Sequence, residues 1–242
     1  MANFNTHFTV SAGASALLSS TLLSMGILAP QEAIGAFFLG TLGGLLPDID
    51  SAYSTSIKIS FNIFSFLATM IVIFLQYVHY SLVEMFLIAF GVFISIRYVF
   101  LEIFRKISTH RGMFHSIPVA IIWGLLLVIF LHLFFGLNPL ISWIYGFMIS
   151  SGYIVHLLLD ELYSVDLGNA RIKKSFGTAF KFFNFKSSFG TLQTLLIYGS
   201  IYLLLGIAPD SSLFIETLFS KESWLTLQTI LLPLDGKWFI HS

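Results

Sequence analysis

Cysteine is absent from this chain of 242 residues, and charged side chains are scarce. Without cysteine there are no disulfide bridges, thiolate metal ligands or cysteine nucleophiles, so a bound metal must take nitrogen and oxygen ligands. Only 10% of the residues are charged, whereas about 25% is usual in a soluble protein. The basic and acidic residues cancel to a net charge of +0, so no overall positive field attracts nucleic acid.

Apolar residues take the place of the missing charges. They make up 57% of the chain, including 27 phenylalanines, and the mean hydropathy is +0.90. This composition is typical of a membrane protein. No Lys or Arg precedes the first apolar stretch, so the basic start of a secretory signal peptide is missing and we expect the first helix to be retained.

Seven apolar stretches are candidates for membrane-spanning helices, because a helix needs about 20 mostly apolar residues to cross the bilayer. They are residues 10–29, 33–46, 59–78, 81–104, 117–137, 140–162 and 189–208. The second is short and ends at Pro47, since the residue before a proline disfavours the helical conformation. Small residues in the first two stretches favour close contact between helices.

Two further segments have an interfacial character. Residues 176–189 interleave Phe with Lys, as in a segment that lies on anionic lipid. Residues 224–234 are apolar but too short to cross, so we expect them to lie on the surface or to re-enter. We therefore predict an all-α, polytopic transmembrane helical bundle of about seven spans with an interfacial C-terminal segment. It forms one domain over residues 1–242, with the motifs in 1–166 and a C-terminal extension in 167–242.

The distribution of basic residues predicts the orientation of the bundle. With seven spans, the loops at 47–58, 105–116 and 163–188 lie on the same side as the N-terminus. These loops contain 9 of the 12 Lys and Arg residues. Because loops rich in Lys and Arg stay inside, this side should face the cytoplasm.

Residues suited to bind a metal gather on that same side. Each lies at the predicted cytoplasmic end of a span, although they are spread over most of the first 160 residues. They are His7, Asp48, Asp50, His110, His115, His156 and Asp160. His79 and His132 fall toward the opposite side. Convergence of so many imidazoles and carboxylates on one layer favours a metal site at the membrane interface.

Each of these residues also has a plainer interpretation. His156 and Asp160 share a helix face and could simply form a hydrogen bond. However, Asp160 lies near a helix C-terminus and near lipid, where its charge is unfavourable unless a cation offsets it. Asp48 and Asp50 could lie in a solvated loop, or a shared divalent ion could relieve their mutual repulsion. Arg111 could set topology, or it could bind a substrate phosphate through its planar fork.

The candidate ligands exceed what one tetrahedral zinc ion needs. They could fill a two-metal site with a bridging water as nucleophile, in which Asp48, Asp50 and Arg111 take the catalytic roles. Zinc is the expected ion, and manganese or another divalent metal is the alternative.

Several short motifs carry a resemblance to a known family. They are Asn5-Thr6-His7, Leu46-Pro47-Asp48-Ile49-Asp50, His110-Arg111-Gly112-x-x-His115-Ser116 and His156-x-x-x-Asp160. In this order they resemble the LexA-regulated, membrane-bound family of predicted metal-dependent hydrolases, over residues 7–166. The resemblance implies a bacterial inner-membrane protein with a metal-dependent hydrolase site. The ligand types are also similar, more loosely, to the zinc phospholipase C and P1 nuclease group.

The expected function is hydrolysis of an ester or phosphoester, such as a lipid head group, at the cytoplasmic membrane face. The expected partners are membrane lipid and a small-molecule or lipid substrate, without nucleic acid. Two alternatives stay open. A cation- or proton-coupled transporter should hold its site near the bilayer midplane, and a non-catalytic structural metal site should have a closed coordination shell.

Overall fold

The computed structural model describes residues 4–50, 55–76, 79–102, 115–166, 171–172, 182–183, 185 and 187–232. Its helices are α1 (Phe4–Ser24), α2 (Pro30–Gly43), α3 (Thr55–Gln76), α4 (Leu82–Ile94), α6 (Ile117–Phe135), α7 (Pro139–Leu162), α8 (Ser188–Ile207), α9 (Ser212–Phe219) and α10 (Lys221–Leu231). A 3₁₀ turn, η1 (Pro47–Asp50), follows α2, and a π-helical segment, η2 (Ser95–Phe100), continues α4. The prediction of a helical protein is confirmed. The exception is a short antiparallel pair, β1 (Val165–Asp166) with β2 (Arg171–Ile172), in which Val165 pairs with Ile172.

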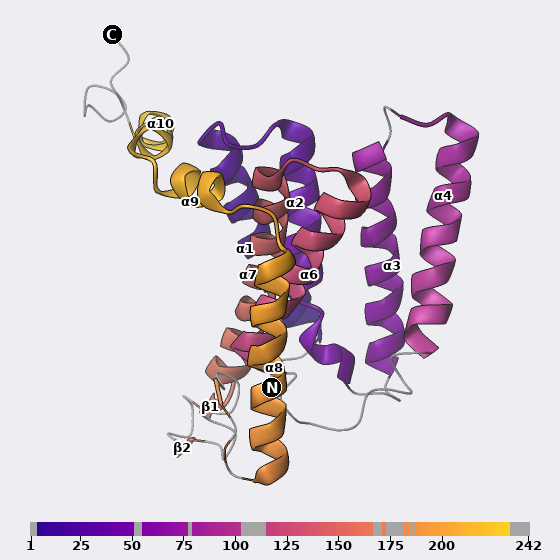
Figure 1. Ribbon diagram of the computed structural model, residues 1–242, viewed down its shortest axis with the longest axis vertical. Helices are drawn as coiled ribbons and strands as arrows, with labels where there is room; N and C mark the ends of the chain where they lie inside the picture. The colour runs from indigo at the N-terminus through magenta and orange to yellow at the C-terminus, as the bar shows by residue number, and fades with distance from the viewer. Residues whose placement is uncertain are drawn as a thin grey trace.

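The helices form a central bundle with a hairpin beside it (Figure 1). The bundle consists of α1, α2, α6 and α7, and the hairpin consists of α3 and α4. Helix α8 runs along α6, and α9 and α10 cover one end of the bundle. At the centre is α7, whose Tyr145, Met148, Tyr153 and Leu157 are at most 1% exposed.

Four helices are long and apolar enough to cross a membrane. They are Leu82–Phe100, Ile117–Phe135, Pro139–Leu162 and Ser188–Ile207. These helices coincide with four of the seven predicted spans, and the full set of seven is not shown for the described residues. Helix α2, for example, has only 14 residues, about 21 Å of helix, whereas the hydrocarbon layer is about 30 Å thick.

Small residues bring α1 against α2. The buried residues of α1 recur every four positions and so form a single stripe on the helix. They are His7, Ser11, Ser15 and Ser19, followed by Leu22. Opposite this stripe, a Cβ added to Gly40 or Gly44 would meet Ser15 or Ser11. The polar stripe of α1 therefore faces α2 rather than lipid, as small residues do where membrane helices touch.

Helices α2 and α7 touch backbone to backbone. A Cβ added to Gly152 of α7 would meet the Gly40 carbonyl and would lie 2.9 Å from the amide nitrogen of Gly44. A Cβ added to Gly43 would meet the carbonyl of Ile149. Only glycine permits so close an approach. The end of α2 is thereby held against the last turns of α7.

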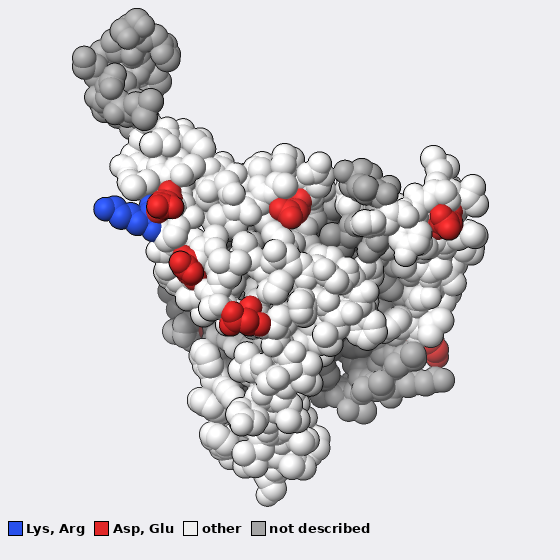
Figure 2. All heavy atoms as spheres, turned by 45° about the horizontal axis from the view of Figure 1, so that its top comes forward, with Lys and Arg blue, Asp and Glu red and all other residues white. Residues whose placement is uncertain are grey.

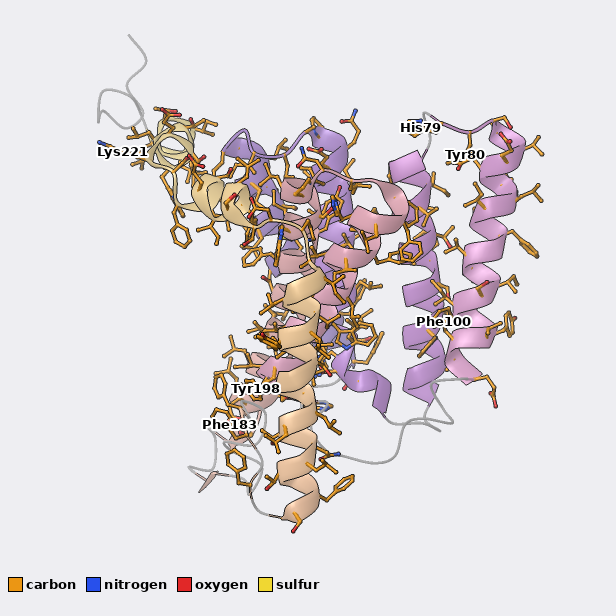
Figure 3. All side chains as sticks on the ribbon, viewed as in Figure 1. His79, Tyr80, Phe100, Phe183, Tyr198 and Lys221 are labelled. Carbon is orange, nitrogen blue, oxygen red and sulfur yellow. The ribbon has the colours of Figure 1, made fainter. Side chains whose placement is uncertain are left out.

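The outer helices expose apolar side chains. No residue of α4 is buried, and Phe86 and Phe90 on it are 76% and 66% exposed. Exposed apolar surface on a helix of this length fits contact with lipid tails. Figure 3 shows His79 and Tyr80 at one end of the α3–α4 hairpin and Phe100 toward the other.

The described parts of both predicted interfacial segments lie on the surface. Phe182, Phe183 and Phe185, from residues 176–189, are exposed, and Phe183 stacks on Tyr198 of α8 at 5.5 Å between ring centroids (Figure 3). Aromatic rings are typical of the membrane interface. The predicted segment 224–234 falls largely in α10, whose 11 residues are too few to cross.

Candidate metal centre

The first turn of α1 supplies His7. Its side chain is 1% exposed because it belongs to the buried stripe of that helix. Its Nε2 atom lies 3.3 Å from Oδ1 of Asp160. His7 Nδ1 is buried and has no hydrogen-bond partner among the described residues. A residue near the start of the chain thus reaches one near the end of α7.

The last turns of α7 supply His156 and Asp160, one helical turn apart. His156 is fully buried and Asp160 is 6% exposed. His156 Nδ1 donates a hydrogen bond to the carbonyl of Gly44, at 2.7 Å. This bond places a proton on Nδ1, so in the neutral imidazole the lone pair of Nε2 is directed into the cluster. It depends on the close contact of α2 with α7, because Gly44 caps α2.

Asp48 reaches the cluster from η1. The chain leaves α2 through Leu45 and Leu46, both buried, and then turns at Pro47 into the 3₁₀ segment. The Oδ1 atom of Asp48 lies 3.5 Å from Nε2 of His156. Its side chain is 30% exposed. Asp48 is therefore at the accessible edge of the cluster.

His115 enters from the start of α6. Ser116 is the N-cap residue in an extended conformation and Pro118 lies in the first turn, an arrangement that suits a helix start. His115 Nε2 lies 3.9 Å from Oδ2 of Asp160. Its ring meets that of His156 edge-on, with 5.9 Å between centroids.

The spacing of the ligand atoms fits a metal ion better than a set of hydrogen bonds. The four His–Asp distances run from 3.3 to 3.9 Å, longer than hydrogen bonds of about 2.7–3.2 Å. Ligands of one tetrahedral zinc ion lie about 3.3 Å apart when the bonds are about 2.0 Å. His156 Nε2 and Asp160 Oδ1 are buried without a hydrogen-bond partner among the described residues.

The electron-rich atoms of the cluster also favour a positive charge between them. The Nε2 lone pair of His156 faces carboxylate oxygens of Asp48 and Asp160, at 3.5 and 3.6 Å. All three atoms are electron-rich, so they repel one another unless a proton or a metal ion lies between them. The rings of His7 and His156 stack with 3.7 Å between centroids, which brings a second imidazole to the same point.

Two overlapping sets of residues could hold a metal. His7, His156 and Asp160 form the buried set, and Asp48, His115 and His156 form the more accessible one. In each set the ligand atoms lie within 4.8 Å of one another. Both sets use His156, and one nitrogen lone pair binds one ion. The described residues therefore make one centre, and a second ion would need ligands from elsewhere.

The structure brings together five of the seven predicted ligands. Asp50 is in η1, but its side chain lies outside the described residues, as do His110 and Arg111 entirely. His132, predicted to lie away from the site, donates from Nδ1 to the carbonyl of Leu137 instead, at 2.9 Å.

The sequence reasoning missed Gly44 as a partner of the site. Gly44 contributes a backbone carbonyl, which a pattern of side chains in the sequence does not predict. The available signal was the adjacent pair Gly43 and Gly44 just before the Pro47 turn. Glycine pairs at the end of a short membrane helix indicate close backbone contact.

Comparisons with known proteins give one match. The family model described as YdjM inner membrane protein matches residues 1–208, which covers α1 to α8. No curated protein and no solved structure matches.

Proposed function

This chain belongs to the YdjM inner membrane protein family, and on that premise we propose that it is a membrane-bound, metal-dependent hydrolase of an ester or phosphoester. The observation that carries the proposal is the lone pair of His156 Nε2, buried and directed at two carboxylates within 3.6 Å. A bound cation would relieve the repulsion among these electron-rich atoms. The regulation by LexA that the resemblance implies stays a prediction.

The residues of the centre divide into holding and reacting roles. His7, His156 and Asp160 are at most 6% exposed and would hold the ion, preferably zinc, with manganese as the alternative. A bound divalent ion supplies Lewis acidity and lowers the pKa of a bound water. His156 is kept in its binding tautomer by Gly44, a type of contact that tunes metal affinity.

Asp48 is the group best placed to meet substrate. It is the most exposed of the residues in the two sets, at 30%, and it lies at the mouth of the centre. There it could accept a proton from the attacking water. Asp50 and Arg111, from the adjoining sequence, remain candidates for orienting water and for binding a phosphoryl oxygen.

The position of the centre favours an enzyme over a transporter. Its residues lie in the first turn of α1, after α2, before α6 and in the last turns of α7. These are all helix ends, whereas transporter sites lie near the midplane between broken helices. The exposure of Asp48 likewise disfavours a closed structural metal site.

We propose that the centre faces the cytoplasm. The loops on its side contain 9 of the 12 Lys and Arg residues. Acidic side chains predominate on the face turned forward in Figure 2. Lys221, labelled in Figure 3, lies at the end of the molecule opposite the centre.

The test compares metal content and hydrolysis across variants of the purified full chain. Asp48→Asn keeps the size of the side chain but removes its charge, and His156→Gln removes the shared ligand. Both should lower hydrolysis of bis(p-nitrophenyl) phosphate and p-nitrophenyl acetate at least tenfold, and His156→Gln should also lose zinc. His79→Ala, at the opposite end (Figure 3), serves as the control.

Two results would overturn the enzyme reading. One is an Asp48→Asn variant that binds zinc and hydrolyses like the parent. The other is a parent protein that hydrolyses neither compound but moves zinc across a vesicle membrane, which would favour the transporter.

A further inference from the structure

A large apolar cavity lies between the α3–α4 hairpin and the central bundle. Its volume is about 920 Å³, near the upper end of the about 300–1,000 Å³ usual for ligand pockets. Helices α2, α3, α4, α6 and α7 and the segment η2 all contribute to its wall. Among the described lining residues, hydroxyl groups come only from Ser95 and Tyr153. The wall thus offers almost nothing to a polar ligand.

The cavity opens sideways toward the lipid. Phe100 of η2 is 59% exposed, and Phe130 and Phe134 of α6 are 48% and 76% exposed, although all three line the cavity. Both helices at this opening are long and apolar enough to span the membrane. An apolar chain could therefore enter from the bilayer without passing through water.

One end of the cavity adjoins the metal centre. Pro47 lines the cavity and directly precedes Asp48. Tyr153 also lines it and lies about one turn before His156 on α7. The same two segments that build the centre thus build the cavity wall. An occupant that fills the cavity up to Pro47 brings its near end to Asp48.

The cavity extends along much of the bundle, away from the metal centre. Its wall on α6 runs from Trp123 to Phe135, about 18 Å at 1.5 Å per residue. This wall reaches Phe135, the last residue of α6. Trp123 is nearer to His115 and the centre, because α6 begins at Ile117.

We propose that this cavity holds the acyl chain of a membrane lipid, whose ester or phosphoester is thereby presented to the metal centre. The inference rests on the proposed function and narrows its substrate class to lipids. Apolar lining, exposed lining residues on membrane helices, a wall about 18 Å long on α6 and an end next to the candidate metal centre all match one amphiphilic molecule. The hydrocarbon part selects the substrate and the centre acts on its polar part.

Gly91 of α4 offers a way to fill the cavity. It lines the cavity, and a Cβ added there meets nothing within 4 Å. The phenylalanine side chain of Gly91→Phe should therefore occupy space that the lipid acyl chain needs, without a clash with the protein backbone. Gly199→Phe is the matched control, because an added Cβ on Gly199 of α8 also meets nothing within 4 Å and Gly199 is not among the described lining residues.

The first measurement is independent of hydrolysis. Full-length protein in phospholipid nanodiscs, with chelator present, is irradiated with a phosphatidylcholine carrying a diazirine in the middle of one acyl chain. Cross-links should map to lining residues of α4 and α6 in the parent and in Gly199→Phe, and should drop at least fivefold in Gly91→Phe. Cross-links spread evenly over all lipid-facing helices overturn the proposal, as does labelling that avoids the lining residues.

The second measurement uses alkyl p-nitrophenyl phosphates from butyl to dodecyl, with zinc. For the parent, kcat/KM should rise with each methylene, by up to about fourfold per step. Gly91→Phe should bind zinc like the parent, which shows that it is folded, and should lose the gain in kcat/KM for the longer alkyl chains that Gly199→Phe retains. A flat chain-length profile in the parent overturns the lipid inference and leaves the hydrolase intact. Specific cross-links without hydrolysis of any compound support the lipid site while the proposed function fails.

Discussion

Replacing Gly152 by alanine tests whether helix contact governs the metal centre. The added methyl group would meet the Gly40 carbonyl and lie 2.9 Å from the Gly44 amide nitrogen. Both neighbours are backbone atoms, so no side chain can rotate away. Carbon atoms pack at about 3.5–4.0 Å, so α2 must move from α7 by about half an ångström or more.

That movement reaches the metal centre directly. The hydrogen bond from His156 Nδ1 to the Gly44 carbonyl is 2.7 Å long, and a shift of this size would stretch it to the limit of about 3.2 Å. Losing a contact that orients a metal-binding histidine lowers metal affinity by about 10–100-fold. Overpacking costs a further ~1–3 kcal/mol of stability, offset by up to about 1 kcal/mol because alanine favours helix more than glycine does.

Zinc titration and thermal unfolding of the purified protein in detergent measure both effects. Gly199→Ala is the matched control, since its methyl group meets nothing within 4 Å and it should bind zinc like the parent. The reasoning fails if Gly152→Ala keeps the zinc affinity of the parent, or if Gly199→Ala loses as much.

Three further predictions follow from the same geometry. A chelator should lower the unfolding temperature of the zinc-loaded protein. Zinc at 100 times its Kd contributes about 2.7 kcal/mol to the free energy of unfolding, so its removal should lower that temperature by roughly 5–11 °C for a chain of this size. An unchanged temperature would argue against a bound metal. Asp160→Asn should abolish zinc binding, as measured by metal analysis. Glu161→Gln, which changes the adjacent acid on α7, should bind zinc like the parent. Equal losses of zinc would mean that negative charge at this helix end, rather than Asp160 itself, supports zinc binding. A reporter fused after Ser187 should read as cytoplasmic in a topology assay, and a periplasmic signal would reverse the orientation of the centre.

Much of the centre could be predicted because alternate helix ends lie on the same side of the bundle. Where successive helices run in opposite directions, every second connection returns to the same end of the bundle, so polar residues at alternate helix ends come close together. His7, Asp48, His115, His156 and Asp160 follow this rule and lie within one cluster. The contact of Gly44 with His156 could not be predicted, because a backbone carbonyl has no sequence signature.

The cavity was also beyond prediction, for a different reason. Its lining residues, such as Leu126, Phe130 and Val92, have the same hydropathy as residues that face lipid. Hydropathy measures transfer out of water and does not distinguish an internal apolar wall from an outer one. Four of the seven predicted spans coincide with long apolar helices of the described residues, and the other three stay a prediction.

The polar stripe of α1 has a consequence for biosynthesis. A ribosome makes His7 first, and Asp160, only 3.3 Å from it in the folded protein, follows 153 residues later. At about 5–20 residues per second this delay is roughly 8–30 s. During that time α1 displays Ser11, Ser15 and Ser19 without the α7 side of the site, and lipid offers them no hydrogen bonds. If the centre binds a metal as proposed, the ion can meet its full set of ligands only after α7 has joined α1 and α2, and a chain truncated before α7 should bind none.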